Sequence, residues 1–129
     1  MKLYVQILVF CVLPLLAGAI VYFFFRAHGI MGFAFGEHPI LPKAKFLVVL
    51  LGVLPDLCWA YSLANALYLY FRHTGRPFAS GSLLILPLVL ASELVQLWLP
   101  RYFTFDLLDL AASLIAFLLS ALYFKNHWA

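Results

Sequence analysis

Four long apolar segments, separated by shorter polar stretches, dominate the hydropathy pattern of the chain. None of them alternates apolar and polar positions as a half-buried strand does, and each approaches the about 20 residues that a helix needs to cross a bilayer. Only helices and closed barrels satisfy every backbone hydrogen bond in lipid. The pattern therefore predicts an all-α membrane protein, a four-transmembrane-helix bundle that forms a single domain over residues 1–129. The expected helices cover about residues 3–25, 46–71, 82–99 and 105–124.

The first apolar segment begins like a signal peptide, because Lys2 precedes it and Ala17-Gly18-Ala19 fits a small-residue cleavage pattern. The apolar run nevertheless continues to Phe25, which makes it long enough to span the bilayer. We therefore expect an uncleaved first helix. Pro14 in its middle removes a backbone donor and predicts a bend.

The second apolar segment is interrupted by Gly52-Val53-Leu54-Pro55-Asp56. This run is compatible with a kink in one continuous helix. It is equally compatible with a new helix that starts after a re-entrant run at 46–54, with Asp56 accepting from the free amides of its first turn. The sequence does not separate the two.

Composition narrows the class of protein further. Apolar residues make up 67% of the 129 residues and charged residues only 10%, against about a quarter charged in soluble domains. A soluble enzyme, a secreted disulfide scaffold, a disordered chain and a nucleic-acid binder are therefore excluded or disfavoured. The two cysteines and four histidines lack metal-ligand spacing, so no metal and no cofactor are expected.

The basic residues lie between the apolar segments, where they act as membrane-flanking anchors. With four helices, each side of the membrane carries four Lys or Arg residues, so their count alone does not orient the protein. If Arg101 belongs to a site, the count favours cytoplasmic termini, and we adopt that orientation.

Four of the five carboxylates fall in or beside the apolar segments, namely Asp56, Glu93, Asp106 and Asp109. An ionisable group at bilayer depth costs at least about 2.5 kcal/mol, so it is rarely left facing lipid. With four crossings, these four acids and Arg101 all belong to the half of the bilayer opposite the termini. Residues of this kind inside a membrane are functional-site candidates by default.

Helical spacing places the polar residues on shared faces. Glu93 and Gln96 are three residues apart, as are Asp106 and Asp109, and Ser113 and Ser120 continue the second stripe. A milder stripe follows Cys58, Tyr61, Ser62, Asn65 and Tyr68. A bundle with these edges turned inward would form a polar pocket. The predicted pocket residues are Asp56, Glu93, Gln96, Arg101, Asp106, Asp109 and Ser113.

The alternative interpretation is structural, with Arg101 paired to an acid and the other polar groups hydrogen-bonded between helices. The charge balance disfavours it, because four acids share one nearby arginine. Some carboxyls must then be protonated, or a ligand must supply positive charge. Catalytic residues, if there are any, cannot be assigned from the sequence.

The ordered motifs Glu93-Leu-Val-Gln96, Leu99-Pro100-Arg101 and Phe105-Asp106-Leu-Leu-Asp109 resemble the signature of the VanZ-like family of small bacterial membrane proteins. The resemblance covers about residues 84–120 and is that of a divergent member. The family often has Asn and Gly where this chain has Ser113 and Ala116, and its Lys and His near Asp56 are replaced here by Leu57 and Ala60. The resemblance implies a multi-pass protein of the bacterial cytoplasmic (inner) membrane, sometimes linked to glycopeptide antibiotic resistance.

Three functions are consistent with these features. The preferred one is a non-enzymatic cell-envelope or glycopeptide-susceptibility factor, whose pocket binds a polar lipid headgroup or a cationic ligand. The second is an intramembrane enzyme on a lipid-linked envelope substrate, since paired carboxyls can act as general acid and base. The third is a structural subunit of a larger membrane complex. Expected partners are membrane lipids and another copy or membrane protein, and no nucleic acid.

Overall fold

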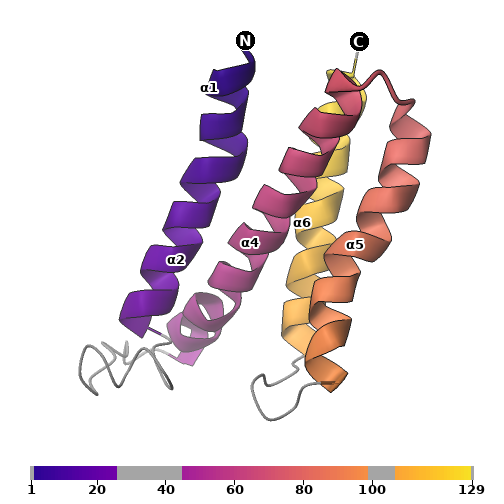
Figure 1. The fold of residues 1–129 in the computed structure, drawn as a ribbon. Coiled ribbons are helices and arrows are strands. Elements are labelled where there is room, and N and C mark those ends of the chain that lie inside the picture. The colour runs from indigo at the N-terminus through magenta and orange to yellow at the C-terminus, as the bar shows by residue number, and fades with distance from the viewer. Residues whose placement is uncertain (1, 26–44, 99–106, 129) are drawn as a thin grey trace.

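The computed structural model describes residues 2–25, 45–98 and 107–128, without the side chains of Phe25, Ser92, Glu93, Gln96 and Leu97. These residues form four helical rods that run alternately up and down, with both ends of the chain at the same end of the molecule (Figure 1). The expected all-α class is confirmed. The first rod is α1 (Leu3–Ile7), η1 (Leu8–Val12) and α2 (Leu13–Phe25), and the others are α4 (Lys45–His73), α5 (Phe78–Trp98) and α6 (Leu107–Asn126).

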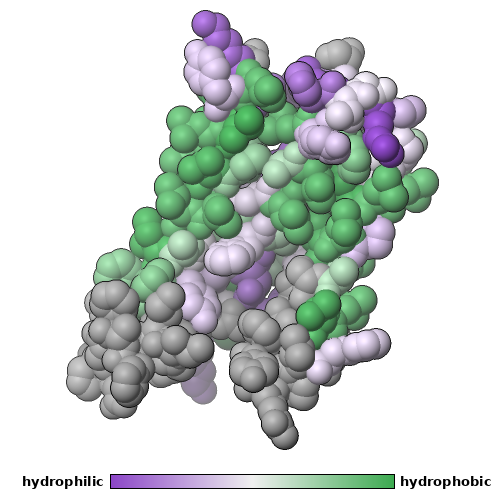
Figure 2. Space-filling view, viewed as in Figure 1, coloured by the Kyte–Doolittle hydropathy of each residue, from purple (hydrophilic) through white to green (hydrophobic). Residues whose placement is uncertain are grey.

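Three of the rods are long and apolar enough to cross a membrane, over Leu3–Phe24, Lys45–His73 and Leu107–Asn126. The described apolar part of α5 is shorter, over Phe78–Ala91. Figure 2 shows apolar residues over the flanks of the molecule, as lipid-facing surfaces require. Leucines such as Leu83 and Leu122 are 76% and 61% exposed, which is costly in water and favourable in lipid. The chain therefore has the features of a multi-pass membrane protein.

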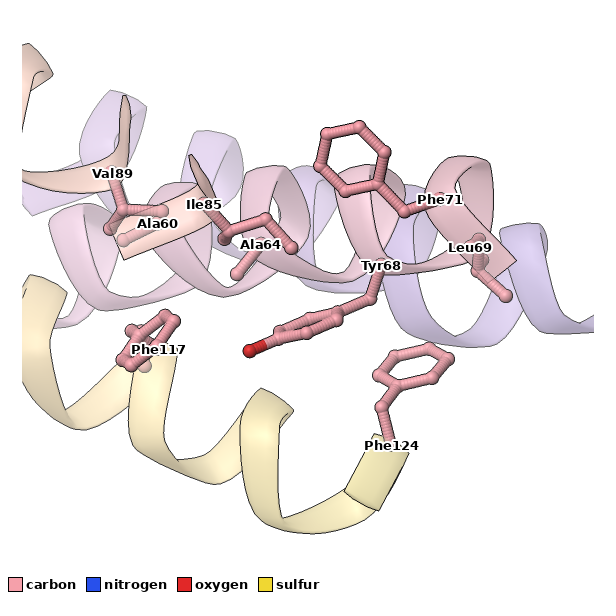
Figure 3. Close-up of a cluster of buried hydrophobic side chains, with 10 residues drawn as sticks. Ala60, Ala64, Tyr68, Leu69, Phe71, Ile85, Val89, Phe117 and Phe124 are labelled. Atoms are coloured by element: carbon pink, nitrogen blue, oxygen red, sulfur yellow. The ribbon is translucent and has the colours of Figure 1, made fainter. Parts of the chain in front are cut away.

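Helix α4 is the centre of the bundle. It packs against α2 on one side and against α5 and α6 on the other, and α5 also packs against α6. Since α4 and α6 both run toward the end that holds the termini, they are parallel neighbours (Figure 1). The core lies between α4, α5 and α6 and is built around the fully buried Tyr68, whose ring stacks near Phe117 and Phe124 (Figure 3).

The predicted disturbance at Pro14 takes the form of a widened helical turn. Residues Leu8–Val12 form a π-helix directly before the proline, and the Leu13 N–H donates to the Leu8 carbonyl, five residues back. Proline has no N–H for the carbonyl four residues earlier, and its ring crowds that turn. A local shift from the α to the π register is one way in which a helix accommodates such a crowded turn.

The open question about the second apolar segment is settled by α4, which continues through Pro55 as one helix of 29 residues. Pro55 is buried in that helix, and Asp56 follows it without a new helix start. The re-entrant alternative for residues 46–54 therefore does not hold.

The connection between α4 and α5 is shorter than expected, because α5 begins at Phe78 rather than near Ser82. Threonine, serine and glycine residues here, which are typical of loops, instead hydrogen-bond to the ends of the two helices or connect them. Thr74 Oγ1 donates to the carbonyls of Tyr70 and Phe71, and Ser80 Oγ donates to the Pro77 carbonyl. Gly75, with a φ of 70°, makes the reversal that only glycine adopts at little cost.

Candidate polar recess between α4 and α6

The structure places three of the seven predicted pocket residues with their side chains. Asp56 lies on α4 and is partly buried, while Asp109 and Ser113 lie on α6 and are buried. Glu93 and Gln96 are positions of α5, but their side chains are outside the described residues. Arg101 and Asp106 also lie outside the described residues. The pocket as a set of seven residues therefore remains a prediction.

Helix α6 turns its polar stripe inward. Asp109 is 3% exposed, and Ser113 and Ser120 are fully buried. Residues at spacings of four and seven share one face of a helix, so the stripe lies on the side of α6 that packs against α4 and α5. Ser120 Oγ donates to the carbonyl of Ala116 on its own helix. The polar group at the N-terminal end of this stripe is the buried carboxyl of Asp109.

Asp56 and Asp109 lie at nearly the same depth. The Tyr68 ring is 6.4 Å from that of Phe117 and 5.2 Å from that of Phe124, so Tyr68 is level with about residue 121 of α6. Asp56 lies about 12 residues before Tyr68 on α4, and Asp109 lies about 12 residues before residue 121 on α6. Each interval corresponds to about 18 Å at 1.5 Å per residue. In two parallel, packed helices, this register brings the two carboxylates to one level.

The position of Glu93 along α5 falls at the same level. The Tyr68 hydroxyl and Ser82 Oγ are 2.9 Å apart, which sets the register of α5 against α4. Position 93 lies about 11 residues, or about 16 Å, further along α5 in the antiparallel direction. It also follows the buried Val89 by four residues. The backbone thus brings three acid-bearing positions from three helices to one depth.

The two described carboxylates do not lie in purely apolar surroundings. Asp56, Asp109 and Ser113 each make a polar or electrostatic contact. In Figure 2 a band of pale and purple residues separates the green flanks and descends over α4 between the first helix and α5. Carboxylates at bilayer depth attract positive charge strongly, because the surrounding dielectric is low. The chemistry that such a place offers is the binding of a cation.

The polar stripe of α4 does not line this recess as one edge. Ser62 Oγ donates to the Cys11 carbonyl at 2.9 Å, and Asn65 Nδ2 donates to the Phe10 carbonyl at 3.3 Å. Tyr68 points to the other side, where it meets Ser82. The stripe therefore divides, with Ser62 and Asn65 serving the first helix and Tyr68 serving the core.

Gly18 and Pro14 of the first helix shape its contact with α4 in ways that the sequence pattern did not indicate. A Cβ added to Gly18 would meet Cys58 Cβ at 2.8 Å and the Pro55 carbonyl oxygen at 3.3 Å, so α2 and α4 approach closely at Gly18. Pro14 leaves the Phe10 carbonyl without its usual helical donor, and that carbonyl is one of those that α4 satisfies. The small residue in Ala17-Gly18-Ala19 was the available signal for this contact.

Among the residues that the structure describes, no group of three or more His, Cys, Asp or Glu side chains is arranged to hold a metal ion. Comparison with protein-family models, with curated proteins and with solved structures finds no match to this chain.

Proposed function

We propose that the protein is a four-span membrane protein that binds a cationic group, such as the amine of a polar lipid headgroup, at the carboxylates of Asp56 and Asp109. The observation that carries the proposal is the packing of α4 against α6 with Asp109 only 3% exposed, from which helical register puts the positions of Asp56 and Asp109 at one depth. In this proposal α5 is the fourth span, which its packing along α4 and α6 supports (Figure 1).

Charge balance supports a positively charged ligand. Two carboxylates at one level repel each other when both are ionised, and the low dielectric of the bilayer strengthens that repulsion. A bound ammonium group removes this repulsion through charge-assisted hydrogen bonds to the carboxylates. The position of Glu93 is at the same level by helical register, and Glu93 joins the site in this proposal. Gln96, Arg101, Asp106 and Ser113 complete the set expected from the sequence.

The resemblance to the VanZ-like family supports the cellular setting of this proposal. In that setting the chain is a non-enzymatic envelope protein of the bacterial cytoplasmic membrane and affects susceptibility to glycopeptides. Both ends of the chain lie at the same end of the bundle (Figure 1), and we place that end in the cytoplasm. The carboxylates then lie in the outer half of the bilayer.

Lipid retention tests the binding proposal. The full chain is reconstituted in nanodiscs of equal parts phosphatidylethanolamine and phosphatidylglycerol, and lipids that survive release into the gas phase are counted by native mass spectrometry. Phosphatidylethanolamine should be retained at least about tenfold over phosphatidylglycerol, a preference of about 1.4 kcal/mol. Asp109→Asn and Asp56→Asn should each reduce this preference, because either change removes a negative charge from the site.

Ser120→Ala is the matched control, because Ser120 is as buried as Ser113 and lies on the same stripe but at the other end of α6. It should keep the preference, while Ser113→Ala should weaken it. Equal retention of the two lipids by the unaltered chain would contradict the proposal. So would an unchanged preference in both carboxamide variants, provided that their helical content matches that of the unaltered chain.

A further inference from the structure

The first helix is held to the bundle unevenly along its length. Its lower half, α2, is fixed at Gly18, where the backbone lies so close to α4 that a single added carbon would overlap Cys58. Its upper half consists of α1 and η1. Above Pro14 the situation reverses, because α1 and η1 contain no buried residue. Figure 1 shows the rod diverging from α4 toward its N-terminal end. One half is therefore anchored by a close backbone contact, whereas the other contains no buried residue.

The change between the halves falls at a weak point of the helix itself. The π-turn Leu8–Val12 and the adjacent Pro14 interrupt the regular ladder of backbone hydrogen bonds. Proline and π-turns are the usual sites at which helices bend. The interrupted hydrogen-bond ladder thus lies at the boundary between α2, which is anchored at Gly18, and the segment before it.

Above the anchor, three of the contacts that hold the upper half to its neighbours involve the π-turn. They are the hydrogen bonds from Ser62 and Asn65 to backbone carbonyls of the π-turn, and the tilted ring contact of Phe10 with Tyr123, whose centroids are 4.6 Å apart. The Asn65 contact is incomplete, since its Oδ1 is buried and has no hydrogen-bond partner among the described residues. A polar contact that leaves an acceptor unsatisfied holds less firmly than a complete one.

From these relations we propose that the junction between the π-turn and Pro14 is a hinge, and that α1 and the π-turn swing about it relative to α4 and α6 while α2 stays fixed. Ser62 and Asn65 form the latch. When α1 swings outward, the Phe10–Tyr123 contact opens and the two polar side chains of the latch become accessible from the lipid. When it returns, they are covered again. The first helix thereby acts as a lateral gate on the polar side of α4.

Spin-label distances in lipid nanodiscs test the hinge. The full chain carries Cys11→Ala and Cys58→Ala, and labels are attached at Tyr4 and Tyr70 for the upper half or at Ile20 and Leu50 for the lower half. All four label positions are exposed. The Tyr4–Tyr70 distance distribution should be about twofold wider than that of Ile20–Leu50, because only the former spans the hinge.

Two variants separate a hinge from general looseness. Pro14→Leu restores a backbone donor to the turn and should narrow the Tyr4–Tyr70 distribution. The double variant Ser62→Ala, Asn65→Leu removes the latch and should shift that distribution to longer distances. Pro87→Leu is the matched control, because Pro87 is exposed within a different helix, and it should change neither pair.

Equal widths for the upper and lower pairs in the chain without these variants would overturn the proposal. An upper distribution that neither Pro14→Leu nor the latch variant alters would overturn it as well. A narrowing caused equally by Pro87→Leu would attribute the effect to proline removal in general and would also count against the hinge.

Discussion

Asn65 on α4 donates a hydrogen bond from Nδ2 to the carbonyl of Phe10 in the first helix, across 3.3 Å. The same Nδ2 also donates to the Tyr61 carbonyl of its own helix, at 2.8 Å. The Phe10 carbonyl is the one that Pro14, four residues later, cannot satisfy. In lipid an unsatisfied carbonyl costs several kcal/mol, so this asparagine compensates a defect that the proline creates in another helix.

This compensation predicts an energetic coupling between Pro14 and Asn65. Asn65→Leu should destabilise the protein by about 1 kcal/mol, because it leaves a buried carbonyl without a donor. In a Pro14→Leu background the same change should cost less, since the restored amide supplies that carbonyl. The measurement is a double-mutant cycle of unfolding free energies by SDS titration in mixed micelles. Strictly additive effects would show that the two residues do not act on the same carbonyl.

The contact at Gly18 predicts strong size dependence at one glycine and none at another. Gly18→Ala should destabilise the protein by about 1–3 kcal/mol, because the new methyl group would force α2 and α4 apart. Gly52 on α4 is the matched control, because a Cβ there meets nothing within 4 Å. Gly52→Ala should be neutral or stabilising by up to about 1 kcal/mol through helix propensity.

The Gly18 prediction is checked by thermal unfolding of both variants in the same detergent. Similar midpoints for Gly18→Ala and Gly52→Ala would contradict the close approach of α2 to α4.

Tyr68 and Ser82 should be coupled through their hydroxyl groups, which lie 2.9 Å apart. Tyr68→Phe and Ser82→Ala should each cost about 0.6 kcal/mol, and the double variant should cost no more than either alone. Tyr70→Phe is a control on the same helix, because Tyr70 is 60% exposed. Unfolding in mixed micelles measures all four variants. A double variant that loses the sum of the single effects would argue against the hydrogen bond.

The C-terminal tail should contribute to stability through Trp128. Its ring meets Tyr68, Phe78 and Phe124 edge-on, and its Nε1 donates to the Arg76 carbonyl at 3.2 Å. Trp128→Phe should cost about 1 kcal/mol by losing the hydrogen bond, and Trp128→Ala about 2 kcal/mol by losing the packing as well. Trp98→Ala should have little effect, since Trp98 is 88% exposed. Equal unfolding midpoints for the Trp128 and Trp98 alanine variants would contradict this role.

Hydropathy sufficed to predict the helices, because a helix in lipid needs only length and an apolar surface. The expected ends at residues 71 and 124 lie within two residues of the ends of α4 and α6. The start of α5 was missed because serine and glycine are ambiguous residues, typical both of turns and of small helix contacts. The same ambiguity hid the role of Gly18 as the contact between α2 and α4.

Helix pairing was harder to predict than helix location. When every face is apolar, hydrophobicity does not indicate which face meets a neighbour. The α6 stripe was predictable because burying Asp109 and Ser113 avoids a large cost in lipid. Ser62 and Asn65 were placed on a milder stripe expected to face the same interior, although they donate to carbonyls of the first helix near Pro14. A proline in one helix and a polar residue in another share no sequence pattern that reveals the pairing.

The register of α6 against α4 is the relationship on which the common depth of Asp56 and Asp109 depends. Labels at Trp59 and Tyr70 on α4 and at Ala111 and Leu122 on α6 report it, because all four positions are exposed and each pair is about 11 residues, or about 16 Å, apart along its helix. Electron paramagnetic resonance distances are measured for all four interhelical combinations, in a chain with Cys11→Ala and Cys58→Ala.

The account predicts that Trp59–Ala111 and Tyr70–Leu122 give similar short distances, and that Trp59–Leu122 and Tyr70–Ala111 are both longer and nearly equal. A slide of α6 by one helical turn would lengthen one crossed distance and shorten the other. Unequal crossed distances, or crossed distances shorter than the matched ones, would place the two carboxylates at different depths and contradict the account.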